Sequence, residues 1–188
     1  PGTCEKQILP ILINCFDKRK IYSKKINLSH SYERVMPGPD YLDSIINNWR
    51  VYSGYNKKSA KLCKNFLSSI INTNKYPLTK LSSLTSSEMA KIMENSYRAV
   101  NIAFIEEWAR FSEKIGTNSF EIINAIRKRP THSNIRQPGF GVGGYCLTKD
   151  PYFASLSARQ IFNVESLDFP FSELAVSTND KMPIENVK

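Results

Sequence analysis

The sequence predicts an α/β segment with a partial parallel sheet, followed by an all-α segment built on one long helix. Three observations support this. From residue 1 to about residue 82, short strand-like runs alternate with helical periods, which is typical of a parallel α/β sheet. From about residue 83, an apolar period of helical spacing continues for about eight turns. The hydrophobic fraction of 41% is ordinary for a protein with a packed core. We therefore expect two parts, 1–82 and 83–188.

The first part contains two expected helices and two expected strands. Residues 5–16 carry apolar side chains at helical spacing, and residues 76–81 and 49–54 have strand character. Prolines and a glycine mark residues 32–39 as a loop. Residues 57–71 predict an amphipathic helix with the apolar face Ala60, Leu62, Cys63, Phe66, Leu67 and Ile70. The part is too short for a complete doubly wound domain, so we expect the second half of a Rossmann-like one.

The second part opens on Thr85-Ser86-Ser87-Glu88, which matches a capping box between the Thr85 side chain and Glu88. Gly116 predicts the end of the long helix in the left-handed conformation. A second helix is expected from Asn118 to Arg127. The long helix has the apolar period Met89, Ile92, Met93, Tyr97, Val100, Phe104, Trp108, Phe111 and Ile115. So broad an apolar face needs a partner, either inside a helical domain or in the seam of a dimer.

The formal net charge of +9 suits nucleic acid, a membrane surface or a small anionic ligand such as a nucleotide. The Lys and Arg residues are scattered without an aromatic RNA-binding pattern, so we expect no nucleic-acid partner. No apolar run reaches the roughly 18–20 residues of a membrane span, so we expect no membrane partner.

The cysteines are Cys4, Cys15, Cys63 and Cys146, and the sequence has only two histidines. No Cys-x-x-C pair or usual zinc spacing is present, so we expect no metal site. So few cysteines in a chain of this length do not indicate a disulfide scaffold. We expect free thiols and a reducing, cytoplasmic setting.

Residues 137–153 carry the densest candidate chemistry. Residues 139–144 match G-x-G-x-x-G, but a dinucleotide-binding fingerprint must follow a strand and open a helix. This one follows a helix stop and a proline-bearing loop, so we reject that interpretation. The glycines instead allow close approach of the backbone to a ligand. Cys146 is then either a nucleophile, helped by neighbouring amides and Lys149, or a small buried hydrophobic residue.

The stretch Gly-Val-Gly-Gly-Tyr-Cys-Leu-Thr-Lys-Asp-Pro, residues 141–151, resembles the catalytic-cysteine signature of the UDP-glucose / UDP-N-acetylhexosamine (GDP-mannose) 6-dehydrogenase family. Three further stretches agree in order and spacing. Residues 1–3 resemble the end of a Thr-Val-x-Pro-Gly-Thr segment, residues 31–38 a substrate loop, and residues 87–95 the start of a long helix. The resemblance covers nearly the whole chain.

The family's fold has a dinucleotide-binding Rossmann domain, a central helical dimerisation domain and a second Rossmann-like domain. The resemblance implies that residues 1–82 are the C-terminal half of the NAD-binding domain and residues 83–188 the central domain. The NAD fingerprint and a catalytic threonine would precede Pro1, and the third domain would follow Lys188. We therefore expect a truncated chain, inactive alone, from a homodimer formed through the long helix.

The resemblance also implies a reaction, the NAD-dependent oxidation of a UDP-sugar C6 alcohol to the uronic acid in two steps. The aldehyde formed first is attacked by a thiolate, and the thiohemiacetal becomes a thioester that water hydrolyses. Cys146 is then the nucleophile, with Lys91 and Asn95 as oxyanion donors, Asp150 orienting water or tuning Lys91, and Glu33 as a base in hydrolysis. Without the resemblance, Lys91 and Asn95 fit a solvated helix face and Asp150 a helix cap.

Substrate and cofactor contacts follow from the same resemblance. Lys149 reaches NAD, and Arg136 contacts a phosphate, a role for which Arg129 competes. The substrate-binding residues are Glu33, Arg34, Val35, Lys91, Asn95, Ile135, Arg136, Gln137, Pro138, Gly139 and Gly143.

Two features leave the sugar open. Tyr145 and residues 147–149 are closer to UDP-glucose members, whereas residues 33–38 and 150–153 are closer to the N-acetylhexosamine branch. A role in surface-polysaccharide precursor synthesis is implied only by the resemblance. The competing function is a non-catalytic dimerisation or nucleotide-sugar-binding module built on the long helix.

Overall fold

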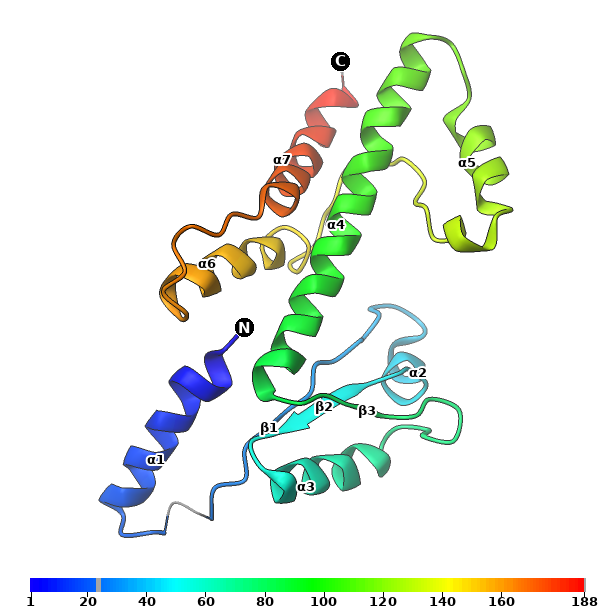
Figure 1. The fold of residues 1–188 in the computed structure, drawn as a ribbon. Coiled ribbons are helices and arrows are strands. Elements are labelled where there is room, and N and C mark those ends of the chain that lie inside the picture. The colour runs from blue at the N-terminus through cyan, green and yellow to red at the C-terminus, as the bar shows by residue number, and fades with distance from the viewer. Residues whose placement is uncertain (23–24, 188) are drawn as a thin grey trace. The chain divides into compact units, whose positions relative to one another are not determined.

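The computed structural model describes residues 1–22 and 25–187 (Figure 1). These residues form two compact units, one of residues 1–91 with 159–163 and one of residues 92–158 with 164–188. The predicted class, α/β plus all-α, is confirmed: the first unit holds a small sheet and the second is helical. Within the described ranges, no helix is long and apolar enough to cross a membrane.

The sheet of the first unit has the order β1 (Ser29–His30), β2 (Val51–Gly54) and β3 (Thr79–Lys80). β2 and β3 are parallel, as expected. β1 and β2 are antiparallel, so the expected parallel arrangement holds only for the second pair. The chain between β1 and β2 contains a loop and the six-residue helix α2 (Tyr41–Ile46), which was not predicted. A connection this irregular does not return the chain as a parallel crossover does.

Helix α3 (Lys57–Ser68) packs against β2, and Tyr52, Ala60, Leu67 and Ile71 form the core between them. Its predicted apolar face is only partly right, because Leu62, Phe66 and Ile70 are exposed. The close approach of the helix to the strand explains this. A β-carbon placed on Gly54 would lie 2.2 Å from the Ala60 amide nitrogen. The helix therefore approaches the strand most closely at Ala60, and Leu67 packs against the strand further along the helix.

The first helical segment consists of η1 (Cys4–Ile8) and α1 (Leu9–Lys18), and the long helix is α4 (Leu84–Lys114). A glutamate near the start of each helix accepts hydrogen bonds from the start of the other. The Glu88 carboxylate accepts the backbone amides of Gly2 and Cys4, the latter at 2.9 Å. In return, the Glu5 carboxylate accepts the Leu84 amide at 3.1 Å and the Thr85 hydroxyl at 3.0 Å. Each helix start is thus satisfied by a side chain from the other helix.

The predicted capping box is therefore wrong. Glu88 serves the other helix, and the Ser83 hydroxyl accepts the Ser86 amide at 3.0 Å at the start of α4. The S/T-x-x-E spacing cannot reveal this, because the N-terminal segment competes for the Glu88 carboxylate. The contact also affects Cys4, whose burial, with the Glu88 carboxylate beside it, raises the pKa of the thiol to about 12.

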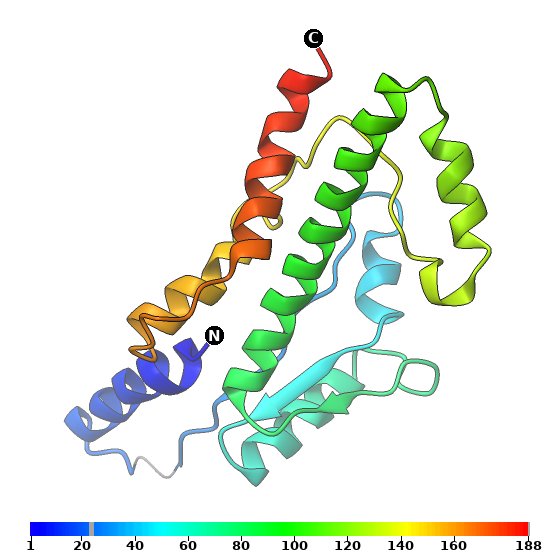
Figure 2. The ribbon, with the colours of Figure 1, turned by 45° about the horizontal axis from the view of Figure 1, so that its top comes forward.

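The second unit holds most of α4 together with α5 (Ser119–Arg127), η3 (Pro130–His132), η4 (Asp150–Tyr152), most of α6 (Phe153–Gln160), and α7 (Pro170–Glu185). α5 and α7 lie on opposite sides of α4 (Figures 1 and 2). The end of α4 and the start of α5 are as predicted. Gly116 has a φ of +72°, and the Asn118 side chain accepts the Phe120 amide at 3.0 Å. The sequence had not divided the region of α6 and α7 into helices.

The packed side of α4 in this unit is made of small residues. Ala99 and Ala103 form a core with Ala175 of α7, and the Asn179 side chain donates to the Ala99 carbonyl at 3.1 Å. Alanines at such a contact let two helix backbones approach closely. The large side chains of the predicted apolar period instead remain about half exposed, between 49% and 55% for Tyr97, Phe104, Trp108, Phe111 and Ile115.

Candidate functional site

Cys146 lies at the surface of the second unit, in the turn that leads into η4. Its carbonyl oxygen accepts the Asp150 amide at 2.9 Å, which closes the turn between the two residues. The protein's other cysteines differ in environment. Cys4 is buried, Cys15 and Cys63 are partly buried, and burial raises the pKa of Cys63. Exposure excludes the interpretation of Cys146 as a small core residue and leaves its sulfur accessible to a substrate.

Asp150 connects the cysteine turn to α4. The carboxylate is only 5% exposed, yet each oxygen has a side-chain donor. Asn95 Nδ2 donates to Oδ2 at 2.7 Å, and Lys149 Nζ donates to Oδ1 at 2.6 Å. A buried carboxylate with a donor on each oxygen is held in one orientation. The two carboxylate oxygens of Asp150 are thus engaged by side chains, whereas the alternative role of a helix cap would use backbone amides.

Lys149 is the cation nearest this network. Its hydrogen bond to Asp150, with smaller contributions from the charges of Asp150, Tyr145 and Cys146, raises the pKa of the ammonium group. The ammonium also lies 4.6 Å from the centre of the Tyr145 ring and 4.8 Å from that of Phe153. The lysine therefore stays protonated at neutral pH, three residues after Cys146 in the chain.

Asn95 is 2% exposed, so it does not belong to a solvated helix face. It precedes by one turn the alanine-lined part of α4, and its amide nitrogen is committed to Asp150. The prediction paired Asn95 with Lys91 as a joint donor set. Along the helix the two residues are one turn apart, with Lys91 in the first unit and Asn95 in the second.

In the first unit, Lys91 forms an ion pair with Glu33. The Lys91 ammonium donates to the Glu33 carbonyl at 3.1 Å, lies 3.4 Å from its carboxylate and sits 5.5 Å from the centre of the Tyr32 ring. Burial alone would raise the pKa of Glu33, but the Val35 amide and the Lys91 charge lower it overall. The carboxylate is ionised at neutral pH. Arg34 donates to the Tyr32 hydroxyl at 2.9 Å, which holds its guanidinium in this cluster.

The segment 135–139 of the second unit is held by polar side chains that the sequence did not identify. Arg127 donates twice to the Ile135 carbonyl, at 3.0 and 2.7 Å. The Arg136 amide donates to Asn101 at 3.2 Å, and the Gly139 amide donates to Glu106 at 2.9 Å. Asn101 and Glu106 are polar residues among the apolar ones of α4, and this is the sequence signal by which they could have been identified. No neighbouring residue in the sequence indicates the role of Arg127.

The side chains of this segment differ in exposure. Ile135 and Pro138 are partly buried, whereas Arg136, Gln137 and the backbone at Gly139 and Gly143 are open to solvent. Arg129, the alternative to Arg136 for a phosphate contact, is also exposed. Within the described ranges, no group of three His, Cys, Asp or Glu side chains is arranged to hold a metal ion.

The sequence profile of the UDP-glucose/GDP-mannose dehydrogenase family, central domain, matches residues 85–181. A UDP-N-acetyl-D-mannosamine dehydrogenase from Methanococcus maripaludis is 40% identical over 168 residues, covering 88% of this chain and 36% of that protein. Solved structures agree. An NDP-N-acetyl-D-galactosaminuronic acid dehydrogenase from Methanosarcina mazei superposes with a TM-score of 0.80 at 27% identity, covering 98% of this chain and 39% of that one.

A UDP-D-ManNAc dehydrogenase from Pyrococcus horikoshii gives a TM-score of 0.77 at 27% identity, over 97% of this chain and 41% of that one. The chain therefore spans roughly two fifths or less of the length of these relatives.

Proposed function

The chain belongs to the UDP-glucose/GDP-mannose dehydrogenase family, and on that premise we propose that it is part of an NAD-dependent enzyme that oxidises the C6 alcohol of a UDP-sugar to the uronic acid. Residues 1–82 then belong to the NAD-binding domain and residues 83–188 to the central domain. One observation carries the proposal, an exposed Cys146 backed by the Asn95–Asp150–Lys149 network.

Cys146 acts in the second half of the reaction. Its thiolate attacks the aldehyde carbon at C6, a C–S bond forms, and the carbonyl oxygen becomes the oxyanion of a thiohemiacetal. Oxidation of this adduct leaves a thioester on Cys146. Water then attacks the thioester carbon, the C–S bond breaks, and the uronic acid leaves with the thiolate restored. NAD, when bound, accepts the hydride that leaves C6 in each oxidation.

The charged residues stabilise and position these species. Lys91 donates to the oxyanion, and Asn95 holds Asp150, which orients the hydrolytic water. Glu33, ionised and paired with Lys91, takes the proton from that water. The Lys149 side chain, 36% exposed with its ammonium fixed by Asp150, fits an anionic or carbonyl group of the cofactor.

The sugar we propose is a UDP-N-acetylhexosamine, with N-acetylmannosamine as the first choice. The relatives with the higher identities are named for that substrate, and residues 33–38 already favoured this branch. In this proposal Arg136 contacts a phosphate, Lys91 faces C6, and Asn95 acts on the substrate through Asp150. The other substrate contacts are Glu33, Arg34, Val35, Ile135, Gln137, Pro138, Gly139 and Gly143.

The test is NADH formation by the full-length protein that contains this chain, measured against a panel of UDP-sugars. We expect about two NADH per sugar with a UDP-N-acetylhexosamine, because two hydrides leave C6 on the way to the acid. The 188 residues alone serve as a control that yields none. Binding of UDP-sugars without NADH formation would contradict the proposed dehydrogenase activity and favour a binding module. Turnover of UDP-glucose alone would contradict the proposed N-acetylhexosamine substrate.

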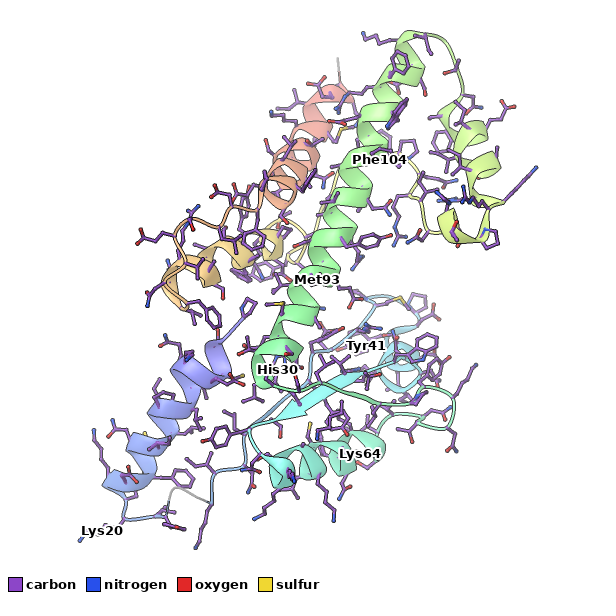
Figure 3. All side chains as sticks on the ribbon, viewed as in Figure 1. Lys20, His30, Tyr41, Lys64, Met93 and Phe104 are labelled. Atoms are coloured by element: carbon purple, nitrogen blue, oxygen red, sulfur yellow. The ribbon has the colours of Figure 1, made fainter. Side chains whose placement is uncertain are left out.

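We further propose that a second copy of this chain covers the exposed side of α4. Phe104, Trp108 and Phe111 line a groove of about 390 Å³ whose other wall is α5, with Ile122 and Ile126 (Figure 3 labels Phe104). Its lining is almost entirely apolar, and large exposed apolar patches mark protein interfaces.

The Trp108→Glu variant tests this proposal by light scattering of the full-length protein. We expect a dimer for the wild type and a shift to monomer for the variant, because a charge would be buried in the seam. The neighbouring exposed substitution Glu107→Gln is the matched control. A monomeric wild type would contradict the proposal.

A further inference from the structure

Glu106 is a buried acid in the middle of α4 that has no place in the chemistry described above. Its side chain is 2% exposed. Burial raises the pKa of its carboxyl group, and the negative charge of Glu113 raises it further. The Gly139 amide and the positive charge of Arg110 act in the opposite direction. Burying an acid is costly, so a carboxyl group kept at such a position needs a compensating contact. Its hydrogen bond from the Gly139 amide, at 2.9 Å, is that contact.

The segment that Glu106 holds has little packing of its own. Phe140, the largest side chain nearby, is 82% exposed. Pro138, Gly139 and Phe140 border a cavity of about 250 Å³, whose opposite wall includes Glu106 and Met182. Polar contacts to the main chain therefore fix the path of this segment.

Three such contacts follow one another along the chain. Asn101, one turn and a half before Glu106 on α4, accepts the Arg136 amide at 3.2 Å. Glu106 accepts the Gly139 amide, and Asn186 at the end of α7 donates to the Gly139 carbonyl at 3.4 Å. Gly139 is thus held through both polar groups of its backbone, with the buried partner on α4.

We propose that Glu106 is a positioning residue for the nucleotide-sugar, acting through the main chain of residues 136–139. This inference rests on the function proposed above, which assigns that segment to the substrate. Glu106 fixes the Gly139 backbone, and Asn101 fixes that of Arg136. Together they set where the Arg136 guanidinium and the Gln137 side chain emerge toward the substrate. Neither acid nor amide touches the reacting atoms.

The experiment compares Glu106→Met with Glu106→Gln in the full-length protein. Methionine keeps the volume and removes the acceptor, whereas glutamine keeps an acceptor oxygen for the Gly139 amide. We expect Glu106→Met to raise the KM for the UDP-sugar by about tenfold, because the Gly139 amide loses its acceptor and the segment its fixed path. The KM for NAD and kcat should change by less than about threefold. Glu106→Gln should restore the KM, and the exposed neighbour Glu107→Met should leave it unchanged.

Several results would overturn the proposal. An unchanged KM for the UDP-sugar in a folded, active Glu106→Met protein removes the positioning role. A parallel loss of kcat and of both KM values, tracking a fall in Tm, makes Glu106 merely structural. If Glu106→Met does not fold, the partly exposed Asn101→Ala decides, with a KM rise of about threefold expected and no rise overturning the idea. If the wild type gives no NADH with any UDP-sugar, the proposed function itself is contradicted, and this outcome is distinct from a failure of the Glu106 proposal.

Discussion

Cys146→Ser in the full-length protein is expected to lower steady-state NADH formation by about 1000-fold or more, with folding unchanged. Serine is nearly isosteric, but its hydroxyl is a far weaker nucleophile at neutral pH than a cysteine sulfur. The second oxidation needs the thiohemiacetal, so turnover stops once the aldehyde has formed. Because Cys146 is exposed, the substitution costs little packing.

The measurement is NADH per enzyme and per sugar, combined with a thermal melt. Cys15→Ser is the matched control, since Cys15 is partly buried on α1 and has no role in the proposed reaction. Uronic acid formed by Cys146→Ser at the wild-type rate would remove the nucleophile from our proposal. Equal losses in both serine variants would point to general damage from cysteine replacement.

Asp150→Asn carries the second largest expected effect, a fall in kcat of about 100-fold. The substitution keeps the shape of the side chain but removes the charge that Asn95 and Lys149 share. An asparagine can still accept one of these two hydrogen bonds, so the fold should survive. In the proposed mechanism the hydrolytic water loses its orienting group, and Lys149 loses the carboxylate to which it donates.

The pH dependence gives a separate signature of this variant. In the wild type, the Asp150 hydrogen bond raises the pKa of Lys149, so the ammonium persists to higher pH. Removing the charge lowers that pKa, and the alkaline limb of the kcat profile should move to lower pH. The exposed Asp180→Asn on α7 is the control. A profile that keeps its alkaline limb, with kcat near the wild-type value, would contradict the role of Asp150.

Features encoded in a few neighbouring residues could be predicted from the sequence. Gly116 ends α4 and Asn118 starts α5 because backbone strain and capping act within one turn. Lys149 and Asp150 follow Cys146 closely enough that a single turn brings them together. The class of the fold follows from periodicity for the same reason.

Features that depend on distant partners could not be predicted. Glu88 leaves the expected capping box because the amides of Gly2 and Cys4, more than eighty residues earlier, compete for it. The apolar face of α3 shifts because Gly54 admits the helix so closely to β2. Glu106 shows only as a charge in an apolar period, and its partner at Gly139 depends on the path of the intervening chain.

The exchange of acids between the two helix starts has a consequence for local unfolding. Glu5 and Glu88 each accept hydrogen bonds from backbone amides at the start of the opposite helix. Fraying of one helix start therefore removes the cap of the other. The ends of these helices therefore open and close as one cooperative element rather than as two independent termini. Lys91, which pairs with Glu33, lies one turn after Glu88, so we expect this lysine to stand on the part of α4 that opens together with the Pro-Gly-Thr segment.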